Sequence, residues 1–434
     1  MIENKIAHVF CLVLLSISAI AQPKDISPLS RFGIGDFAEE NFVNLQSMGG
    51  VSAAYADPYN TNLVNPASIG HLRVTSFEFG VNVKYKELKN EELSENFGSG
   101  GLGYASLAFP LRNSINKLLD RKEYKWNYGM SFSIRPYTNV NYDIISIDSA
   151  NTDIGRVIRL FEGSGGTYKF EWGMSAQTKN ISFGMSIGYL LGNISNRREV
   201  FTSDVVASLR PAIDSEYAVS GFLWKAGLIY DLKLNDKKTL SFGIYGNTDV
   251  TFRTNGSQLE RRINEDLGIN DTISFQPDLE GKGLLPSEIG FGVYYKSDKS
   301  NYGISFKTSD WSKYRNEANP EDKPLTRAWR VGAGGFFIPN DRSLKYFKRV
   351  AYKFGAFAGK DPRSGLINNE DIDYLGVNLG MGLPFVFQRQ VSFVNLGIEL
   401  GQMGTEALIK ETYFKFSVGI TFNDNTWFQK RKYY

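Results

Sequence analysis

Alternation between apolar and polar residues is the feature of this sequence that most restricts its fold. Every second residue from Ile181 to Tyr189 is large and apolar, and the residues between them are Ser or Gly. The segment from Phe414 to Phe422 alternates in the same way. Because successive side chains of a β-strand point to opposite sides, each such segment has one apolar and one polar face. Fourteen segments of this kind begin near residues 73, 101, 125, 166, 181, 217, 238, 284, 301, 325, 349, 372, 391 and 411.

The length of these segments favours a membrane barrel over a soluble β-sandwich. Several run for ten or more residues, whereas soluble strands average about 5–6 residues and tilted transmembrane strands need about 9–11. A large sandwich would also alternate, but here the polar face is rich in Gly, Ser and Asn, as a crowded barrel interior would be. Aromatic residues recur at strand ends, as in interfacial girdles. We therefore predict an all-β fold in which residues 71–422 form a transmembrane up-and-down antiparallel β-barrel of about 14 strands.

The connections between the segments differ in length. Short polar turns are predicted at Leu234–Lys238 and Ser297–Ser300, and long polar loops at Lys84–Ser99, Asp148–Gly166 and Thr254–Lys282. Short periplasmic turns and long outer loops are typical of barrels in the bacterial outer membrane, which is the location we predict. No predicted strand carries a proline at a point where a kink would open the wall.

The first 21 residues have the pattern of a secretory signal peptide. A polar start with Lys5 precedes an apolar stretch from Ile6 to Ile20, and the small residues Ala19 and Ala21 suit cleavage before Gln22. The alternative is an N-terminal apolar core helix. The rest of the sequence contains no apolar stretch of about 20 residues, so no membrane-spanning helix is expected.

The amino-acid composition excludes several classes of function. The 49 Lys and Arg residues nearly balance the 46 Asp and Glu residues, which gives no basic face for a nucleic acid. Cys11 is the only cysteine, and the only histidines are His8 and His71. A zinc site of Cys and His, a thiol nucleophile and a disulfide framework are therefore excluded in the mature chain. A Ser-His-Asp triad would need His71, which no nucleophile-elbow sequence accompanies. We predict no enzyme activity, no metal and no cofactor.

Residues 22–70 precede the barrel and do not alternate. They are rich in Gly, Asn, Asp and Pro, and a structureless connection of this length is unusual. Polar barrel walls can satisfy the backbone groups of an irregular segment. We therefore predict that residues 22–70 form a hatch inside the barrel lumen.

This segment resembles the FadL-like family of outer-membrane transporters for hydrophobic compounds. The resemblance rests on Gly49–Ala54, on Asp57 and on Asn65-Pro66-Ala67 directly before the first strand. Members of that family have a 14-stranded barrel with an N-terminal hatch. Further segments look like a branch common in Bacteroidetes-type bacteria, namely Ser27–Asp36, Phe422–Asp424 and Trp427–Lys432.

The resemblance implies passage of a hydrophobic small molecule similar to a long-chain fatty acid. Family members bind the ligand near the hatch and release it sideways through an opening in the wall. Lateral exit is physically reasonable because each CH₂ group exposed to water costs about 0.8 kcal/mol. The ligand-binding or hatch candidates are Phe32, Phe37, Met48, Asn65, Pro66 and Ala67. The alternative for the aromatic residues and Met48 is that they pack the hatch against the wall.

Several charged residues fall on the predicted inward face. They either pair with one another and with the hatch, or form a site for a charged head group. These residues are Glu78, Lys169, Glu171, Lys353, Glu399 and Lys415.

A second function from another class is compatible with the same fold. FadL-like barrels of Bacteroidetes-type bacteria include components of the type IX secretion machine, so the chain is alternatively a non-transporting accessory subunit. The basic, aromatic tail at residues 423–434 would then contact a translocon subunit in the periplasm, or else anchor at the membrane interface through Trp427 and Phe428. Outer-membrane lipid is an expected partner in either case. The aromatic strand Tyr413–Phe422 is a signal for the barrel-assembly machinery during biogenesis.

Overall fold

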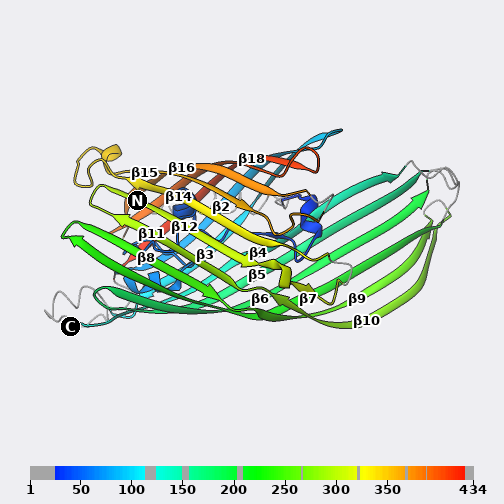
Figure 1. Ribbon diagram of the computed structural model, residues 1–434, viewed down its shortest axis with the longest axis horizontal. Helices are drawn as coiled ribbons and strands as arrows, with labels where there is room; N and C mark the ends of the chain where they lie inside the picture. Colours follow the sequence, from blue (N-terminus) through cyan, green and yellow to red (C-terminus); the bar gives the residue numbers. More distant parts are fainter. Residues whose placement is uncertain are drawn as a thin grey trace, which may run out of the picture.

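A closed antiparallel sheet dominates the computed structural model. The structure describes residues 25–112, 124–148, 156–202, 209–264, 267–319, 323–366, 370–387 and 389–425. The predicted signal peptide and residues 426–434 of the predicted tail lie outside these ranges. The sheet closes where the last strand, β18 (Lys410–Asp424), pairs with the first barrel strand, β2 (Thr75–Lys89) (Figure 1). Within the described ranges, no helix is long and apolar enough to cross a membrane.

The wall consists of 14 antiparallel strands, as predicted. Two of them are each divided into two parts, because β8 continues into β9 after Thr248-Asp249, and β10 continues into β11 after Pro286-Ser287. The short turns after β7 and β11 are confirmed. The remaining wall strands are β3 (Ser94–Pro110), β4 (Asn127–Asp148), β5 (Val157–Gln177), β6 (Ile181–Thr202), β7 (Arg210–Asn235), β8 (Lys238–Asn247), β9 (Val250–Asn264), β10 (Ile269–Leu285), β11 (Glu288–Lys296), β12 (Ser300–Asp310), β14 (Arg327–Phe337), β15 (Ala351–Lys360), β16 (Asp373–Phe387) and β17 (Gln390–Met403).

The period-2 pattern separates a lipid-facing side from a luminal side. On β5, Phe170, Trp172 and Met174 are 41–46% exposed, whereas the intervening Lys169 and Glu171 are 5–6% exposed. Aromatic rings gather on the outside near the strand ends, for example Phe422 at 5.1 Å from Phe387. An apolar exterior around a polar interior is the arrangement of a transmembrane barrel.

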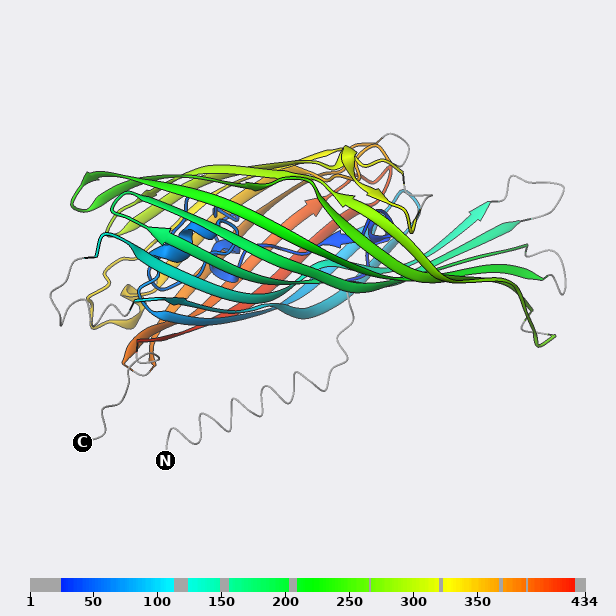
Figure 2. The same cartoon turned by 90° about the horizontal axis from the view of Figure 1, so that it is seen from below.

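The N-terminal segment lies inside the barrel (Figure 2). We refer to residues 25–71 as the hatch. It is mostly irregular, and its backbone is held by short elements and by hydrogen bonds to the inward faces of the wall strands. These elements are η1 (Pro28–Arg31), β1 (Asp36–Phe37), α2 (Val43–Gln46) and η2 (Pro66–His71).

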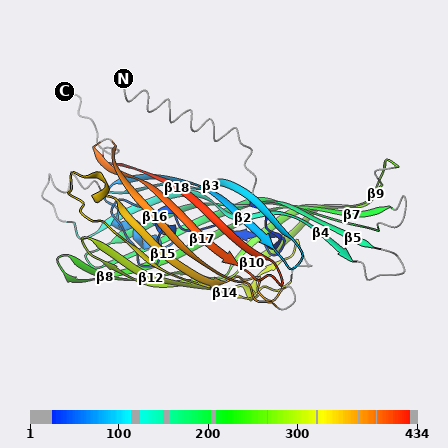
Figure 3. The same ribbon diagram turned by 90° about the horizontal axis from the view of Figure 1, so that it is seen from above.

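The wall extends far beyond one end of the barrel (Figures 2 and 3). The prediction of long loops at Lys84–Ser99, Asp148–Gly166 and Thr254–Lys282 is therefore wrong, because most of these residues belong to strands. On β10, for example, most residues between Asn270 and Glu280 are exposed on both faces of the strand. A strand with water on both sides needs no alternation of apolar and polar residues, so the sequence pattern stops where the apolar environment ends.

Two interruptions divide the wall near this end. Strand β3 pairs with β4 only from Ala105 to Pro110. On the other side, β10 pairs with β9 along its length but contacts β13 (Arg315–Asn316) only at Gly283-Leu284. Between the interruptions, β4, β5, β6, β7, β9 and β10 continue as a separate curved sheet, which we call the extension.

A proline lies where β4 separates from β3. Pro136 follows two residues after the last paired residue, Ile134, and the register of β4 against β5 shifts between Pro136 and Thr138. Proline lacks the N–H group that a strand neighbour would use and is accommodated at edges and bulges. Pro136 therefore lies at a bulge of β4, and the expectation about a proline at a lateral opening stays a prediction.

Candidate functional site

The hatch backbone lies directly against inward-facing glycines of the wall. A Cβ atom at Gly243 of β8 would overlap the backbone of Ala53, and one at Gly332 or Gly355 would overlap the backbone of Gly49. These wall positions need glycine because a hatch peptide group occupies the space of a side chain. The close approach of the hatch backbone therefore explains why the luminal face of the wall is rich in glycine.

The Asn-Pro-Ala triplet fixes one end of the hatch to the wall. The side-chain oxygen of Asn65 accepts a hydrogen bond from the backbone N–H of Ala67 at 3.0 Å and caps η2. Its Nδ2 atom donates to the carbonyl oxygen of Ala53 at 2.6 Å. Ser175 of β5 donates to the carbonyl oxygen of Ala67 at 3.0 Å. Asn65, Pro66 and Ala67 are buried, and these contacts give the triplet a structural role at this end.

The other three candidates lie elsewhere in the hatch. Met48 is fully buried in a cluster with Leu45 and Tyr294. Phe32 and Phe37 both pack against the larger apolar cluster. This cluster lies at the mouth, by which we mean the end of the barrel where the extension begins. The ring of Phe37 lies 4.5 Å from that of Trp311. The structure therefore brings Phe32 and Phe37 together but places Met48 and the Asn-Pro-Ala triplet in separate contacts.

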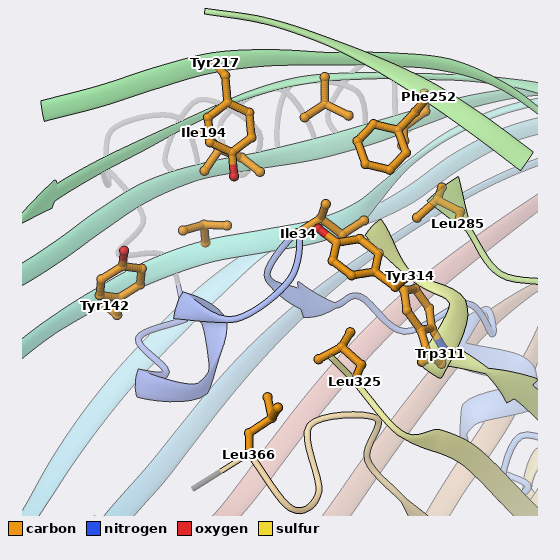
Figure 4. Packing of buried hydrophobic residues seen from close by; sticks show 13 residues of the cluster. Ile34, Tyr142, Ile194, Tyr217, Phe252, Leu285, Trp311, Tyr314, Leu325 and Leu366 are labelled. Atoms are coloured by element: carbon orange, nitrogen blue, oxygen red, sulfur yellow. The ribbon is translucent and has the colours of Figure 1, made fainter. Parts of the chain in front are cut away.

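The apolar cluster at the mouth joins three parts of the chain (Figure 4). The hatch contributes Ile34, the extension contributes residues such as Tyr217 and Phe252, and the connection between β12 and β14 contributes Trp311 and Tyr314. All five side chains are at most 8% exposed. The cluster attaches the extension to the hatch and covers the luminal side of the mouth.

Two adjacent glutamates of the hatch bind cations on the wall. Oε2 of Glu40 lies 3.1 Å from Nζ of Lys307, and Oε1 lies 3.6 Å from Nζ of Lys225. Glu39 lies 3.2 Å from Nη1 of Arg330. Burial opposes the ionisation of Glu39, but Arg330 and nearby Lys415 hold its pKa at about 2. Burial likewise opposes the ionisation of Glu40, yet Lys225 and Lys307 lower its pKa well below the usual range. Both carboxylates are therefore charged at neutral pH.

The beginning of the hatch makes a second set of ion pairs. Asp25 lies 3.1 Å from Nζ of Lys84 and 2.7 Å from Nζ of Lys86 on β2, and Lys86 also lies 3.1 Å from Glu411 on β18. Burial opposes ionisation of Asp25, but the two lysines lower its pKa. The hatch is thus held by charges on β2, and on β7, β12 and β14 through Glu39 and Glu40.

The six charged residues predicted to face inward all have partners. Lys169 lies 3.0 Å from Glu171, and Lys415 lies 2.9 Å from Glu399. Lys353 donates to Asn44 of the hatch and to Asn395 of the wall, and Glu78 accepts from the backbone N–H of Thr61 in the hatch at 2.6 Å. The expectation that these charges pair with one another or with the hatch is confirmed.

His71 ends η2 and bridges the hatch to β5 and β6. The side-chain amide of Gln177 donates to Nδ1 at 2.9 Å, so the ring proton is on Nε2, which donates to Ser182 at 3.0 Å. Burial lowers the pKa of His71 to about 4, against the opposing charge of Asp231. A protonated Nε2 atom does not act as a base toward Ser182, so this arrangement differs from a Ser-His pair in a hydrolase.

Two adjoining grooves of about 680 and 560 Å³ cross the extension. Their walls include Glu162 and Ser164, which continue the outward-facing positions of β5. Four acidic residues and two arginines line the larger groove, and Arg261 binds Asp214 with an Nε–Oδ2 distance of 2.8 Å. The grooves lie on the outer face of the extension, which continues the lipid-facing side of the barrel. Because their lining is polar, we infer that the extension lies in water and not in the membrane.

Sequence reasoning missed the contacts that hold the hatch. Glu39-Glu40 is visible as an acidic pair within the hatch, but its wall partners lie more than 180 residues away in the chain. Such pairs carry no local sequence signal. The same applies to the apolar cluster, whose members come from nearly the whole chain.

The closed 14-stranded antiparallel barrel has FadL-like structural neighbours. The structure is similar to that of a Pseudomonas aeruginosa FadL homologue, with 11% identity over 90% of this chain and 99% of that chain, and a TM-score of 0.56. The Pseudomonas putida toluene transporter TodX is 14% identical over 90% of this chain and 99% of that chain, with a TM-score of 0.55. The Ralstonia pickettii toluene transporter TbuX is 10% identical over 89% and 99% of the two chains, with a TM-score of 0.52.

The chain belongs to the BamG family, whose model matches residues 1–434. Among curated proteins, none matches the sequence. The structural similarity at 10–14% identity shows the fold alone.

Proposed function

We propose that this chain is a non-transporting barrel subunit of the machinery that assembles or exports proteins at the bacterial outer membrane. The name of the BamG family suggests a link to the barrel-assembly machinery. The observation that carries the proposal is the fixed hatch, whose Glu39 and Glu40 bind cations on three wall strands. A barrel that is held closed in this way serves as a scaffold better than as a passage.

Energetics support a closed lumen. Removing one partner from a fully buried ion pair costs about 3–5 kcal/mol, because the other charge is left without compensation. The side chains of the Glu39–Arg330 and Glu40–Lys307 pairs are 19–33% exposed, so each pair contributes less than this. Moving the hatch would separate Glu39 from Arg330 and Glu40 from Lys307, and Ala67 would also lose the hydrogen bond that it accepts from Ser175 of the wall. A ligand would have to offset all of these losses before it passed.

The extension supplies surface for a protein partner. It carries the two grooves, which charged and polar side chains line, and projects beyond one end of the barrel (Figure 2). The predicted periplasmic tail, residues 423–434, offers a second contact at the opposite end. We further propose that the protein is located in the outer membrane of a Bacteroidetes-type bacterium. The type IX secretion machine is the alternative assembly to which the subunit would belong.

The test is purification of the tagged full chain from its native outer membrane in mild detergent, followed by mass spectrometry of bound proteins and lipids. We expect other subunits of an assembly or secretion machine in a fixed ratio, with bulk lipid only. A stoichiometric apolar molecule without a protein partner would reject the accessory role. Deleting the chain should also lower the amount of folded outer-membrane proteins, and normal amounts would argue against it.

Passage of a hydrophobic small molecule is the second candidate, and the interrupted wall favours it. The edge of β4 that β3 leaves after Ile134 lies beside Phe37, which pairs with Thr138 and packs on Tyr137 with ring centroids 6.0 Å apart. An apolar molecule bound at Phe32 and Phe37 would leave there without crossing water. Uptake of a long-chain fatty acid by the deletion strain, with and without the restored chain, tests this function. Equal uptake would exclude it, and a Phe37→Ala variant should reduce uptake more than a Phe109→Ala variant.

A further inference from the structure

The connection between β14 and β15 exposes large apolar side chains on an ordered loop. We call residues 338–349 the basic loop; it contains η4 (Tyr346–Lys348). Leu344 is 101% exposed and Phe347 is 71% exposed. The loop is closed by a hydrogen bond of 2.8 Å from the backbone N–H of Asn340 to the carbonyl oxygen of Lys348. Apolar side chains that an ordered loop holds out in solvent indicate a surface that covers them.

The basic loop also carries a concentrated positive charge. Residues 340–349 contain one acidic residue, Asp341, and four basic residues, which are Arg342, Lys345, Lys348 and Arg349. None of these cations has an acidic partner within 4.0 Å in the part of the chain that the structure describes. Arg349 instead lies over the ring of Tyr346 at 5.5 Å. The loop therefore complements an anionic surface that also accepts apolar groups.

The position of the basic loop points to the membrane. The hydroxyl group of Tyr352 donates to the carbonyl oxygen of Phe347 at 3.1 Å. Tyr352 faces lipid, in one row with Phe337 and Met381, which are 43% and 44% exposed. The loop also begins at the short-turn end of the barrel, since the backbone N–H of Ile338 donates to Lys299 in the turn between β11 and β12. It thus continues the apolar belt at its rim (Figure 1).

We propose that the basic loop binds anionic phospholipid headgroups in the leaflet at the short-turn end, with Leu344 and Phe347 inserted beneath them. Cations above and apolar side chains below are the arrangement by which interfacial segments bind lipid. A docked protein would also cover the loop, but continuity with the lipid-facing row favours the membrane. The proposal rests on the transmembrane fold and is independent of the proposed function.

The test uses the full chain with Leu344→Cys, labelled with an environment-sensitive fluorophore. Cys11 is the only cysteine and lies in the predicted signal peptide, so the label has a single site in the mature chain. The protein is reconstituted in vesicles of phosphatidylcholine with or without phosphatidylglycerol. The matched control is Asp236→Cys, in the polar turn between β7 and β8, which is at the same end because Thr239 pairs with Lys296.

We expect the label at 344 to shift to shorter emission wavelength and to resist quenching by aqueous iodide when phosphatidylglycerol is present, while the label at 236 stays accessible. Replacing the four cations by Gln should reduce the ratio of inserted to free loop by about fivefold for each cation. Equal quenching at 344 and 236 in phosphatidylglycerol vesicles would overturn the proposal. So would cross-linking of Leu344→Cys to a protein in native outer membranes. A heat-dependent shift on a gel confirms that each variant is folded.

Discussion

Replacing a wall glycine that faces the hatch should release the hatch without unfolding the barrel. Gly243 of β8 offers a strict case, because a Cβ atom there would lie 2.5 Å from the carbonyl carbon of Ala53 and 2.7 Å from Cα of Ala54. Real Cβ contacts are at least 3.0 Å, and both obstacles are backbone atoms that have no rotamer to change. The hatch must therefore retreat by about half an ångström or more.

The magnitude follows from the cost of overpacking. Extra methyl groups in a packed interior cost about 1–3 kcal/mol, which changes the ratio of docked to undocked hatch by about 5- to 150-fold. Gly243→Val should therefore raise the conductance of the reconstituted barrel in a planar bilayer and expose the hatch to protease. The barrel should still show its heat-dependent shift on a gel.

Gly98→Val is the matched control, since a Cβ atom at Gly98 meets nothing within 4 Å. It changes a strand glycine in the same way but leaves the hatch contact intact. If Gly243→Val and Gly98→Val give the same conductance and the same protease resistance, the close contact between the wall glycines and the hatch does not hold the hatch in place. That result would refute the prediction.

Three further changes act on the hatch and on the mouth. Glu40→Gln leaves Lys225 and Lys307 with Glu288 as their remaining close carboxylate, so limited proteolysis should cut the hatch faster than in the control Glu280→Gln; equal rates would contradict the role of the pair. Acid should loosen the hatch as well: the pKa of Glu39 is about 2 in the folded chain, below its usual 4.5, so its contribution is complete above pH 4.5 and is lost as the pH falls toward 2. Because His71 titrates at about 4 instead of 6.5, stability is also lost between these values, and conductance recorded from pH 7 to 3 should rise, whereas a flat profile would be inconsistent with both shifts. Trp311→Ala removes a large buried side chain from the mouth cluster and should cost about 3–5 kcal/mol, seen as faster hydrogen exchange in the extension but unchanged exchange in β15 and β16.

The sequence predicts the part of the fold that the membrane shapes. Each of the fourteen alternating segments corresponds to a wall strand, because a lipid-facing side and a luminal side impose period 2 on every residue between them. Strand β10 shows where this argument ends. Its outer half has water on both faces, so the residues of the extension look like a loop in the sequence.

The candidate site was less accessible to prediction. The Asn-Pro-Ala triplet is predicted from its resemblance to a family motif, and the structure places it against β5, β6 and β7 of the wall. The partners of Glu39 and Glu40 depend on the curvature of the closed wall, which brings β7, β12 and β14 toward one point. The bulge at Pro136 is visible only in the register of β4 against its neighbours, which depends on strands distant in the sequence.

The contact between the hatch and the glycines suggests an order of assembly. The same segment lies against Gly184 of β6, Gly243 of β8, Gly332 of β14 and Gly355 of β15, which are spread around the circumference. We expect the strands to gather around the N-terminal segment as an open sheet, so that the pairing of β18 with β2 is the final step. In this order of assembly, the hatch guides the curvature of the wall.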